Sequence, residues 1–272
     1  MVWIDPEFVV PTIPDTEKYE GTEADANVLQ ALPNGVTIKW SSTCGASSWA
    51  ISSKLDTISA DGQEKSYFLK VYTASGALDI ARGEFEGIRK LAAAIPDNVP
   101  TPVAYGLCAN DPSRAFFLAQ FSAMTDELPG IMDLISVVLK IHQEPSPSGK
   151  FGFDVTTFSG KHGSDNTWCD TWEEFFTRAM RGTMNGELAI HGPDEELQRL
   201  SEDILTKVIP RLIRPMETEG RRIEPVLVHG DLWHGNVSIH NDTKAPILYD
   251  PCCFYGHNEC QPPLPPLLPL MA

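Results

Sequence analysis

The sequence predicts an α+β protein, in which a small antiparallel sheet is followed by a mainly helical region. Between Val36 and Phe121, five short groups of β-branched and aromatic residues are separated by turn-forming residues. Beyond Met124, apolar residues recur at steps of three and four, which is the period of an amphipathic helix. At 272 residues with 42% hydrophobic residues, the chain can bury the core of one large domain or of two lobes.

The expected sheet begins as a meander of three antiparallel strands. Their predicted ranges are 36–40, 49–55 and 66–72, joined by turns at 41–48 and 59–62. An amphipathic helix is predicted over 78–94, ending before Pro96. Two further strands at 103–107 and 115–121 then complete five strands, with one helix inserted after the third.

The region after Met124 is predicted to be helical, with one long loop. The expected helices cover 131–143, 171–180 and 195–213, and the loop covers 145–168, which is rich in Gly, Ser and Pro. Two short apolar runs at 226–228 and 247–249 are expected to pair as a hairpin, with the turn Asn241-Asp242 between them.

Composition excludes several classes of partner. The chain has 37 acidic against 21 basic residues, a net charge of −16, so a nucleic acid or an anionic membrane surface is not expected to bind it. We find neither a secretory signal in residues 1–14 nor about 18 uninterrupted apolar residues, which predicts a cytoplasmic protein. The six cysteines have no paired metal-binding spacing and are expected to be free thiols, mostly buried.

The chemistry is predicted to lie in the segment His229-Gly230-Asp231-Leu232-Trp233-His234-Gly235-Asn236 and in Asp250. Asp231 can accept the proton of an attacking hydroxyl, while Asn236 and Asp250 offer the hard oxygen ligands that suit Mg²⁺. A base and two metal ligands in this order are typical of a phosphoryl-transfer site. His229 is expected to be structural, with its ring hydrogen-bonded to the loop backbone, and the same expectation holds for His234 and His257.

Lys70 is the candidate for the positive charge that a nucleotide phosphate needs. It lies near the end of the third predicted strand, in an apolar setting where its amine must face an anion. Glu84 on the following helix is the favoured partner, and Glu86 is the alternative on a different face of that helix. The turn at 41–48 carries a single glycine, Gly45, and fits an ordinary hairpin as well as a phosphate-covering loop.

These motifs resemble those of the fructosamine and ketosamine kinases, also called protein-ribulosamine 3-kinases. The resemblance rests on His-Gly-Asp-Leu-Trp-x-Gly-Asn at 229–236, on Asp-Pro-x-x-Phe-Tyr-Gly-His at 250–257, and on Glu259. Trp172-x-x-Phe-Phe also matches. Trp233 is the most specific feature, because the related aminoglycoside and choline kinases usually carry another residue there.

The resemblance implies a bilobal protein-kinase-like fold that uses ATP and Mg²⁺ to phosphorylate the 3-hydroxyl of a ketosamine, a step in protein deglycation. It assigns Asp231 as the proton acceptor, Asn236 and Asp250 as metal ligands, and Lys70 with Glu84 as the phosphate-positioning pair. Backbone groups in the segment that links the two lobes are implied to hold adenine; that segment contains Gln120, Phe121 and Ser122.

The resemblance divides the chain into four parts. They are a lead-in at 1–34 with one helix near 24–31, a nucleotide-binding lobe at 35–122, a catalytic lobe at 123–260, and a Pro/Leu-rich tail at 261–272. Five prolines in the tail forbid the helices that the family has there, so we expect a truncated or altered C-terminus rather than a polyproline ligand. Two alternative functions stay open: a kinase for another small alcohol, and a non-catalytic binding protein.

Overall fold

The computed structural model of the protein describes residues 21–260, which form two compact units. The first unit comprises residues 21–82 and Pro102–Ser122, and the second comprises Gly83–Thr101 and the chain from Ala123 onward. Most of the predicted lead-in and all of the predicted tail lie outside the described residues. Each unit is described by itself below.

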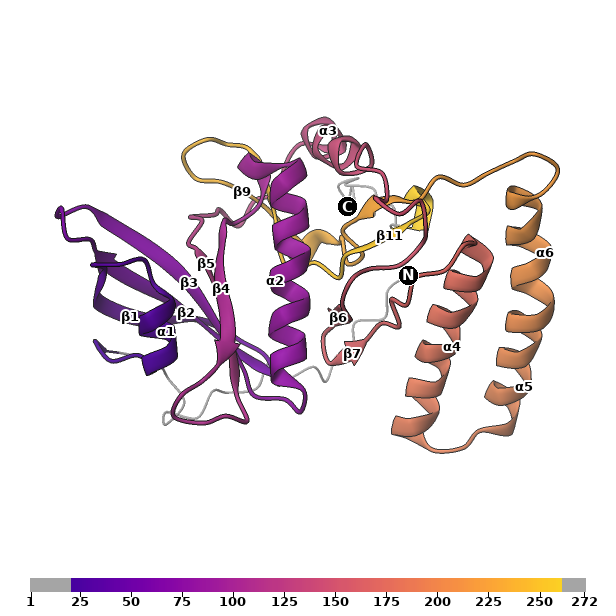
Figure 1. Ribbon diagram of the computed structural model, residues 1–272, viewed down its shortest axis with the longest axis horizontal. Helices are drawn as coiled ribbons and strands as arrows, with labels where there is room; N and C mark the ends of the chain where they lie inside the picture. Colours follow the sequence, from indigo (N-terminus) through magenta and orange to yellow (C-terminus); the bar gives the residue numbers. More distant parts are fainter. Residues whose placement is uncertain (1–20, 261–272) are drawn as a thin grey trace, which may run out of the picture. The chain divides into compact units, whose positions relative to one another are not determined.

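The first unit is built on the five-stranded sheet that the residue pattern predicts (Figure 1). The strands are β1 (Thr37–Ala46), β2 (Ala50–Ile58), β3 (Glu64–Tyr72), β4 (Pro102–Leu107) and β5 (Ala115–Gln120). They lie in the order β1-β2-β3-β5-β4, and every neighbouring pair is antiparallel. The predicted meander, and the helix inserted after the third strand, are therefore confirmed.

Alternation along the strands gives this sheet two different faces. Leu55, Tyr67 and Leu69 are almost fully buried and pack with Val28 of the short helix α1 (Ala26–Ala31). The residues between them point to the other face, because successive side chains of a strand alternate. Lys70 belongs to that second face, as do its β3 neighbours Ser66 and Phe68, and all three are only partly buried.

Asp25 fastens α1 to the turn between β4 and β5. Its carboxylate accepts hydrogen bonds from the backbone N–H groups of Asn27, Ala109 and Asn110, each at 2.9 Å. We expect Asp25→Ala to lower the free energy of unfolding by about 1–2 kcal/mol, because a helix cap is lost and two turn N–H groups lose their acceptor. Urea unfolding would measure this, with Asp61→Ala, in an exposed turn of the same sheet, as the control; equal losses in both variants would contradict the prediction.

The turn predicted at 41–48 is much shorter in the structure. β1 continues through Gly45 to Ala46, with a register shift between Thr43 and Gly45, so most of the expected loop is strand. The connection is tightened by Ser47, whose Oγ accepts hydrogen bonds from the N–H groups of Trp49 and Ala50. The single glycine thus lies in a strand, not at the tip of a phosphate-covering loop.

The second unit is mainly helical, as predicted, with three small two-stranded sheets. Its helices are α2 (Ala77–Ala94, which begins in the first unit), α3 (Ile131–Ile141), α4 (Trp172–His191), α5 (Glu195–Asp203) and α6 (Ile209–Ile213). Its strands are β6 (Phe158–Ser159), β7 (His162–Gly163), β8 (Val226–Val228), β9 (Val237–Ile239), β10 (Pro246–Leu248) and β11 (Phe254–Gly256). No helix in residues 21–260 is long and apolar enough to span a membrane.

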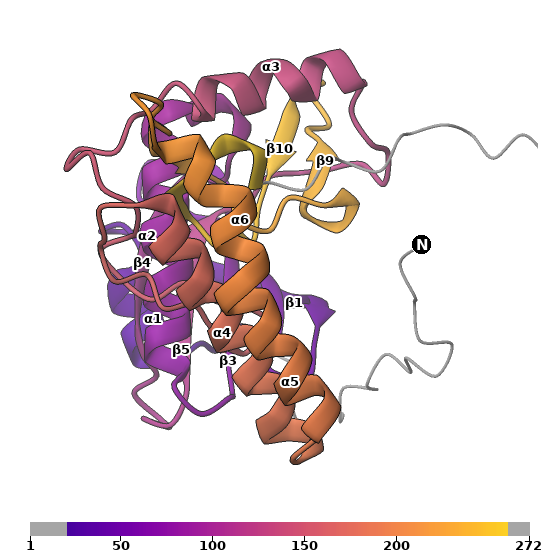
Figure 2. The same cartoon turned by 90° about the vertical axis from the view of Figure 1, so that its right-hand side faces the viewer.

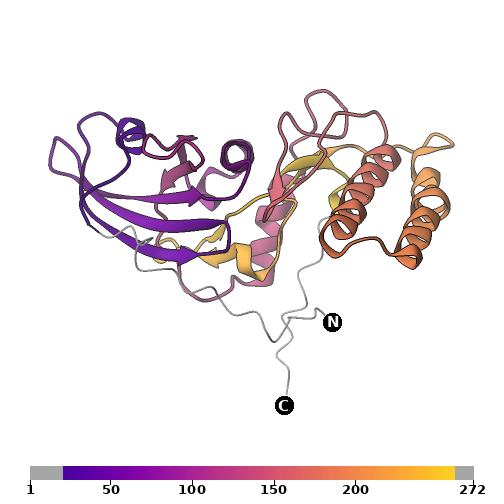
Figure 3. The ribbon, with the colours of Figure 1, turned by 90° about the horizontal axis from the view of Figure 1, so that it is seen from below.

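The helices of this unit pack in two places. α3 packs beside β10 (Figure 2), where Leu134, Val137 and Ile141 join the main core with Leu248. α4 lies alongside the rod that α5 and α6 form (Figure 3). A π-helical turn at Ile204–Val208 joins α5 to α6, so the single helix predicted over 195–213 is interrupted but continues in the same direction.

Two glycines one turn apart bring α2 against loops of the second unit. A Cβ at Gly83 would lie 2.6 Å from the Thr156 carbonyl oxygen, and a Cβ at Gly87 would lie 3.2 Å from the Pro251 ring. Cys253 Sγ also lies 3.7 Å from the Gly87 carbonyl oxygen. Such close approach explains why residues 83–101 group with the second unit, although they fall in the range expected for the first lobe.

The predicted pairing of 226–228 with 247–249 is wrong. β8 pairs with β11, and β10 pairs with β9, which follows the catalytic-loop motif directly. Both apolar runs are strands, but alternation within a run does not specify its partner. The turn Asn241-Asp242 therefore joins β9 to β10.

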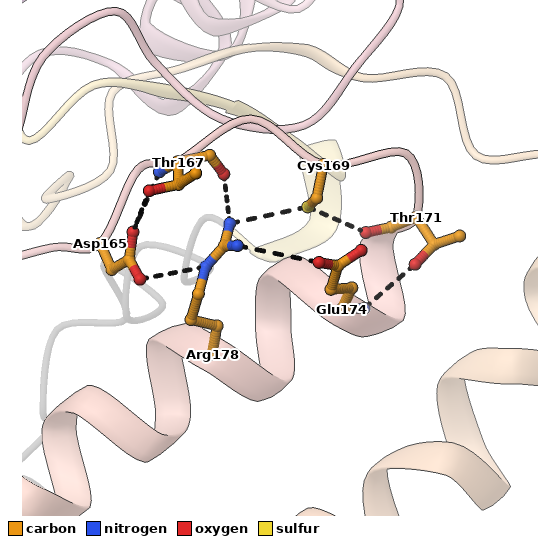
Figure 4. Close-up of polar contacts among 6 residues, drawn as sticks. All are labelled: Asp165, Thr167, Cys169, Thr171, Glu174 and Arg178. Carbon is orange, nitrogen blue, oxygen red and sulfur yellow. Dashed lines mark hydrogen bonds and ion pairs between the residues drawn. The ribbon is translucent and has the colours of Figure 1, made fainter.

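Arg178 anchors the start of α4 to the preceding segment (Figure 4). Its guanidinium donates to the Thr167 carbonyl oxygen, lies 3.3 Å from an Asp165 oxygen, and lies 3.7 Å from Cys169 Sγ. At the helix N-terminus, the Thr171 hydroxyl accepts the N–H of Glu174 at 3.2 Å. This cluster explains why α4 starts where Thr171 predicts, and α4 then runs eleven residues past the predicted end at Met180.

Candidate active site

Asn236, in the loop between β8 and β9, contacts both of the other residues predicted to carry the chemistry, Asp231 in the same loop and Asp250 after β10. The amide nitrogen of Asn236 donates to the Asp231 carbonyl oxygen at 2.8 Å and lies 3.2 Å from Asp231 Oδ2. The same nitrogen lies 3.4 Å from the carbonyl oxygen of Asp250. Asn236 is buried, so it fixes the distance between the predicted base and the second predicted metal ligand.

His229 is a structural residue, as predicted. Its side chain is fully buried, with Nε2 3.1 Å from the Tyr249 carbonyl oxygen and Nδ1 3.4 Å from the N–H of Asp231. A neutral ring that donates from Nε2 and accepts at Nδ1 satisfies both contacts. Burial lowers the pKa of His229 from 6.5 to about 4, against the opposing effects of the Tyr249 carbonyl and the Asp250 charge.

We expect this histidine to make the protein less stable in mild acid. The unfolded chain binds a proton at His229 near pH 6.5, whereas the folded chain resists it down to about pH 4. The free energy of unfolding should therefore fall by about 2 kcal/mol from pH 7 to pH 5 through this residue alone. Urea unfolding at both pH values would measure the loss, and His229→Gln should show a smaller one. An unchanged pH dependence in that variant would contradict the prediction.

The two carboxylates of the site differ in their environments. Burial raises the pKa of the Asp231 carboxyl, the hydrogen bond from Asn236 lowers it, and the charge of Asp250 raises it again, so the net shift is upward. Asp250 has a left-handed backbone with φ of +52°, a conformation that Asp adopts more readily than most residues. The fold therefore determines the direction in which the Asp250 side chain leaves the backbone.

Trp233 lies two residues after Asp231, and its ring is half exposed, at 46%. A Cβ at Gly235 would meet that ring at 2.5 Å, so the ring rests directly on the glycine backbone. The His234 ring packs edge-on against the indole, with centroids 4.7 Å apart. An exposed indole thus packs on the loop that carries Asp231.

Sequence reasoning missed a buried polar network behind Asp250. Thr157 is fully buried; its Oγ1 donates to the Cys253 carbonyl oxygen at 3.1 Å and accepts from Asn166 Nδ2 at 2.8 Å. Cys252 Sγ also contacts this hydroxyl at 3.4 Å, while the Cys252 N–H donates to the His229 carbonyl oxygen at 2.9 Å. The segment after Asp250 is therefore held from two sides, and nothing in the Gly/Ser-rich sequence around Thr157 indicates this role.

We expect Thr157→Val to destabilise the protein by about 2 kcal/mol, because the similar volume keeps the packing while Asn166 and the Cys253 carbonyl lose a buried partner. Thr157→Ser keeps the hydroxyl and should lose less than half as much. Both values can be read from urea unfolding curves. A valine variant as stable as the wild type would show that the hydroxyl is dispensable.

The first unit carries the other predicted residues apart from Glu84. Lys70 lies on β3, and Gln120 is the last residue of β5. The Phe121 N–H donates to the Ser66 carbonyl oxygen at 3.0 Å, so this group of the predicted adenine-binding segment is already used. Ser122 ends the unit.

The two candidate glutamates of α2 differ in their burial and in their contacts. Glu84, the favoured partner of Lys70, is buried at 9% exposure. Glu86 is engaged elsewhere, because Arg89 one turn along the helix contacts its carboxylate at 2.6 Å.

Comparison with solved structures defines the class of protein. A protein of Thermobifida fusca named after fructosamine-3-kinase superposes with a TM-score of 0.66 at 21% identity, covering 88% of this chain and 76% of that one. The aminoglycoside phosphotransferase APH(4)-Ia, in a ternary complex with AMP-PNP and hygromycin B, superposes with a TM-score of 0.53 at 13% identity. That match covers 82% of this chain and 70% of the other. The α+β fold is therefore of the kinase-like type, as predicted.

The sequence comparison identifies the family. A family model described as fructosamine kinase matches residues 29–268, and the chain belongs to this family. A chloroplastic protein-ribulosamine 3-kinase of rice (Oryza sativa subsp. japonica) is 30% identical over 199 residues. That alignment covers 72% of this chain but only 54% of the rice protein, so the chain spans about half the length of this relative.

Proposed function

We propose that the protein is an ATP- and magnesium-dependent kinase that phosphorylates the 3-hydroxyl of ketosamines on lysine amines and so acts in deglycation. The observation that carries the proposal is the hydrogen-bonded set of Asp231, Asn236 and Asp250 on two adjacent loops. Family membership and the rice ribulosamine kinase favour a ketosamine as the acceptor.

Asp231 acts as the proton acceptor in this proposal. The hydroxyl oxygen of the acceptor forms a bond to the γ-phosphorus while the bond to the leaving ADP oxygen breaks, and Asp231 Oδ takes the released proton. The carboxylate has the required access, because Asp231 is only partly buried. Its raised pKa makes the Asp231 carboxylate a stronger base than a fully solvated aspartate.

The donor set of the site fits a magnesium ion. The side-chain hydrogen bonds of Asn236 to described residues all use its amide nitrogen Nδ2, so its Oδ1 is the atom that would bind a metal. With the Asp250 carboxylate it offers two hard oxygen donors, and Mg²⁺ takes the rest of its ligands from phosphates and water. When bound, the ion would neutralise phosphate charge as the γ-phosphoryl group is transferred.

Lys70 and Glu84 complete the proposed nucleotide site. Lys70 would bind the phosphates, with Glu84 orienting its ammonium, and backbone groups of Gln120 and Ser122 would hold adenine. The burial of Glu84 supports this role, because a buried carboxylate requires a cationic or hydrogen-bonding partner.

Trp233 would bind the sugar part of the acceptor. An indole that is 46% exposed and fixed on Gly235 offers a flat apolar surface, against which the C–H groups of a sugar can pack. Its position two residues from the base would bring the acceptor hydroxyl towards Asp231.

The decisive experiment measures ADP release by the purified protein with ribulose-lysine or fructose-lysine and Mg-ATP. We expect turnover with a ketosamine, and none when Mg²⁺ is chelated. Turnover with choline or an aminoglycoside in place of the ketosamine would support the alternative of another alcohol kinase. Absence of turnover together with no thermal shift in Mg-ATP would support a non-catalytic protein and reject the proposal.

A further inference from the structure

The face of the first unit's sheet that carries Lys70 also carries a second lysine, Lys54. In the pairing of β2 with β3, Ser52 lies opposite Lys70 and Lys54 lies opposite Phe68. Directly opposed residues of an antiparallel pair share a face, so Lys54 is on the Lys70 side of the sheet. The two lysines are about 7 Å apart along the strand direction, since they differ by two strand positions.

Lys54 is held at the end of this face that is nearest to Phe121. Its Nζ lies 2.8 Å from Asp56 Oδ1 and 5.2 Å from the centroid of the Phe121 ring. Asp56 is in turn fixed by the Ser66 hydroxyl, which donates to the same oxygen at 2.7 Å. Because the Ser66 carbonyl accepts the N–H of Phe121 at 3.0 Å, the ammonium and the Gln120–Ser122 segment form one connected group.

The surroundings of Lys54 suit a flat aromatic ligand. Ala119, which lies opposite Phe68 on β5, is fully buried, whereas the Phe68 and Phe121 side chains on the same face are only partly buried. An ammonium has three donors, of which Asp56 takes one and the Phe121 ring faces another. At least one N–H is left for a ligand, and about a third of the Lys54 side chain, 34%, is open to solvent.

We propose that Lys54 is a second nucleotide-binding lysine, which donates a hydrogen bond to the purine base of ATP while Lys70 binds the phosphates. This inference rests on the proposed function and adds to it a residue that recognises the base. The base would lie against the partly exposed rings of Phe68 and Phe121, and the Lys54 ammonium would donate to one of its ring nitrogens. Asp56 acts as a positioning residue, because it reaches the nucleotide only through Lys54.

The test is nucleotide binding by Lys54→Met, which keeps the length of the side chain and removes the charge. We expect the dissociation constant for ATP to rise about tenfold, the size of effect typical of a lost hydrogen bond to a charged group. The affinity for inorganic tripolyphosphate, which has no base, should not change. Lys70→Met should weaken both ligands.

A matched control is available on the same sheet. Lys39 forms its own ion pair, with Nζ 2.6 Å from Glu64 Oε1, and Lys39→Met should leave ATP binding unchanged. The proposal is overturned if Lys54→Met and Lys39→Met bind ATP equally well, or if Lys54→Met weakens tripolyphosphate as much as ATP. If the wild-type protein binds neither ATP nor tripolyphosphate, the proposed function itself fails, a result distinct from the other two.

Discussion

In the proposed kinase reaction, replacing Asp231 by Asn should lower kcat by about 1,000-fold or more, because positioned acid–base catalysis contributes on that scale. Asn has nearly the same shape and can still accept the hydrogen bond from Asn236, so the loop should keep its geometry. What is lost is the ability to take a proton from the attacking hydroxyl. The measurement is steady-state ADP release at saturating Mg-ATP and ketosamine.

The control for this substitution is Asp242→Asn, which removes a carboxylate from the exposed turn between β9 and β10. It should leave kcat and both KM values within about twofold, as surface substitutions usually do. Nucleotide binding by Asp231→Asn should also be near normal. If Asp231→Asn kept a tenth or more of the wild-type turnover, another group would have to be the base.

Elements with a strong local pattern could be predicted from the sequence. α2 and α3 are each longer than ten residues, so their apolar residues repeat often enough to reveal the helical period. The predicted range of each helix lies within two residues of its observed ends. The partners of short strands could not be predicted, because the pairing of β8 with β11 joins segments that no turn connects. Topology of this kind depends on packing of the whole unit.

The same distinction applies to the site. Asp231 and Asn236 are separated by five positions and share one loop, so their spacing alone indicates a common function. Thr157 reaches the segment after Asp250 from 96 residues away in the sequence, and it lies in a Gly/Ser-rich stretch that reads as an ordinary loop. A contact between residues so far apart in the sequence leaves no pattern in the neighbouring residues. The residues that support the site can therefore be identified only from the folded structure.

Gly230 is the position in the loop where an added methyl group should reduce activity most. Its φ is +80°, and a Cβ there would lie 1.9 Å from the Cys252 carbonyl oxygen, a distance that no packing adjustment of a side chain can relieve. Gly230→Ala must therefore separate the two loops that carry Asp231 and Asp250. A displacement of about 1 Å at a catalytic site costs on the order of 100-fold in rate, so we expect kcat to fall at least that far.

Gly220 provides a control that separates the clash from the backbone strain. It has the same φ of +80°, but a Cβ would meet nothing within 4 Å. Gly220→Ala should thus cost only about 1 kcal/mol of stability from the left-handed backbone, with kcat unchanged. Both variants would be compared in urea unfolding and in ADP release. If Gly230→Ala behaved like Gly220→Ala in both measurements, the close contact with Cys252 would not be what holds the loops of Asp231 and Asp250 together.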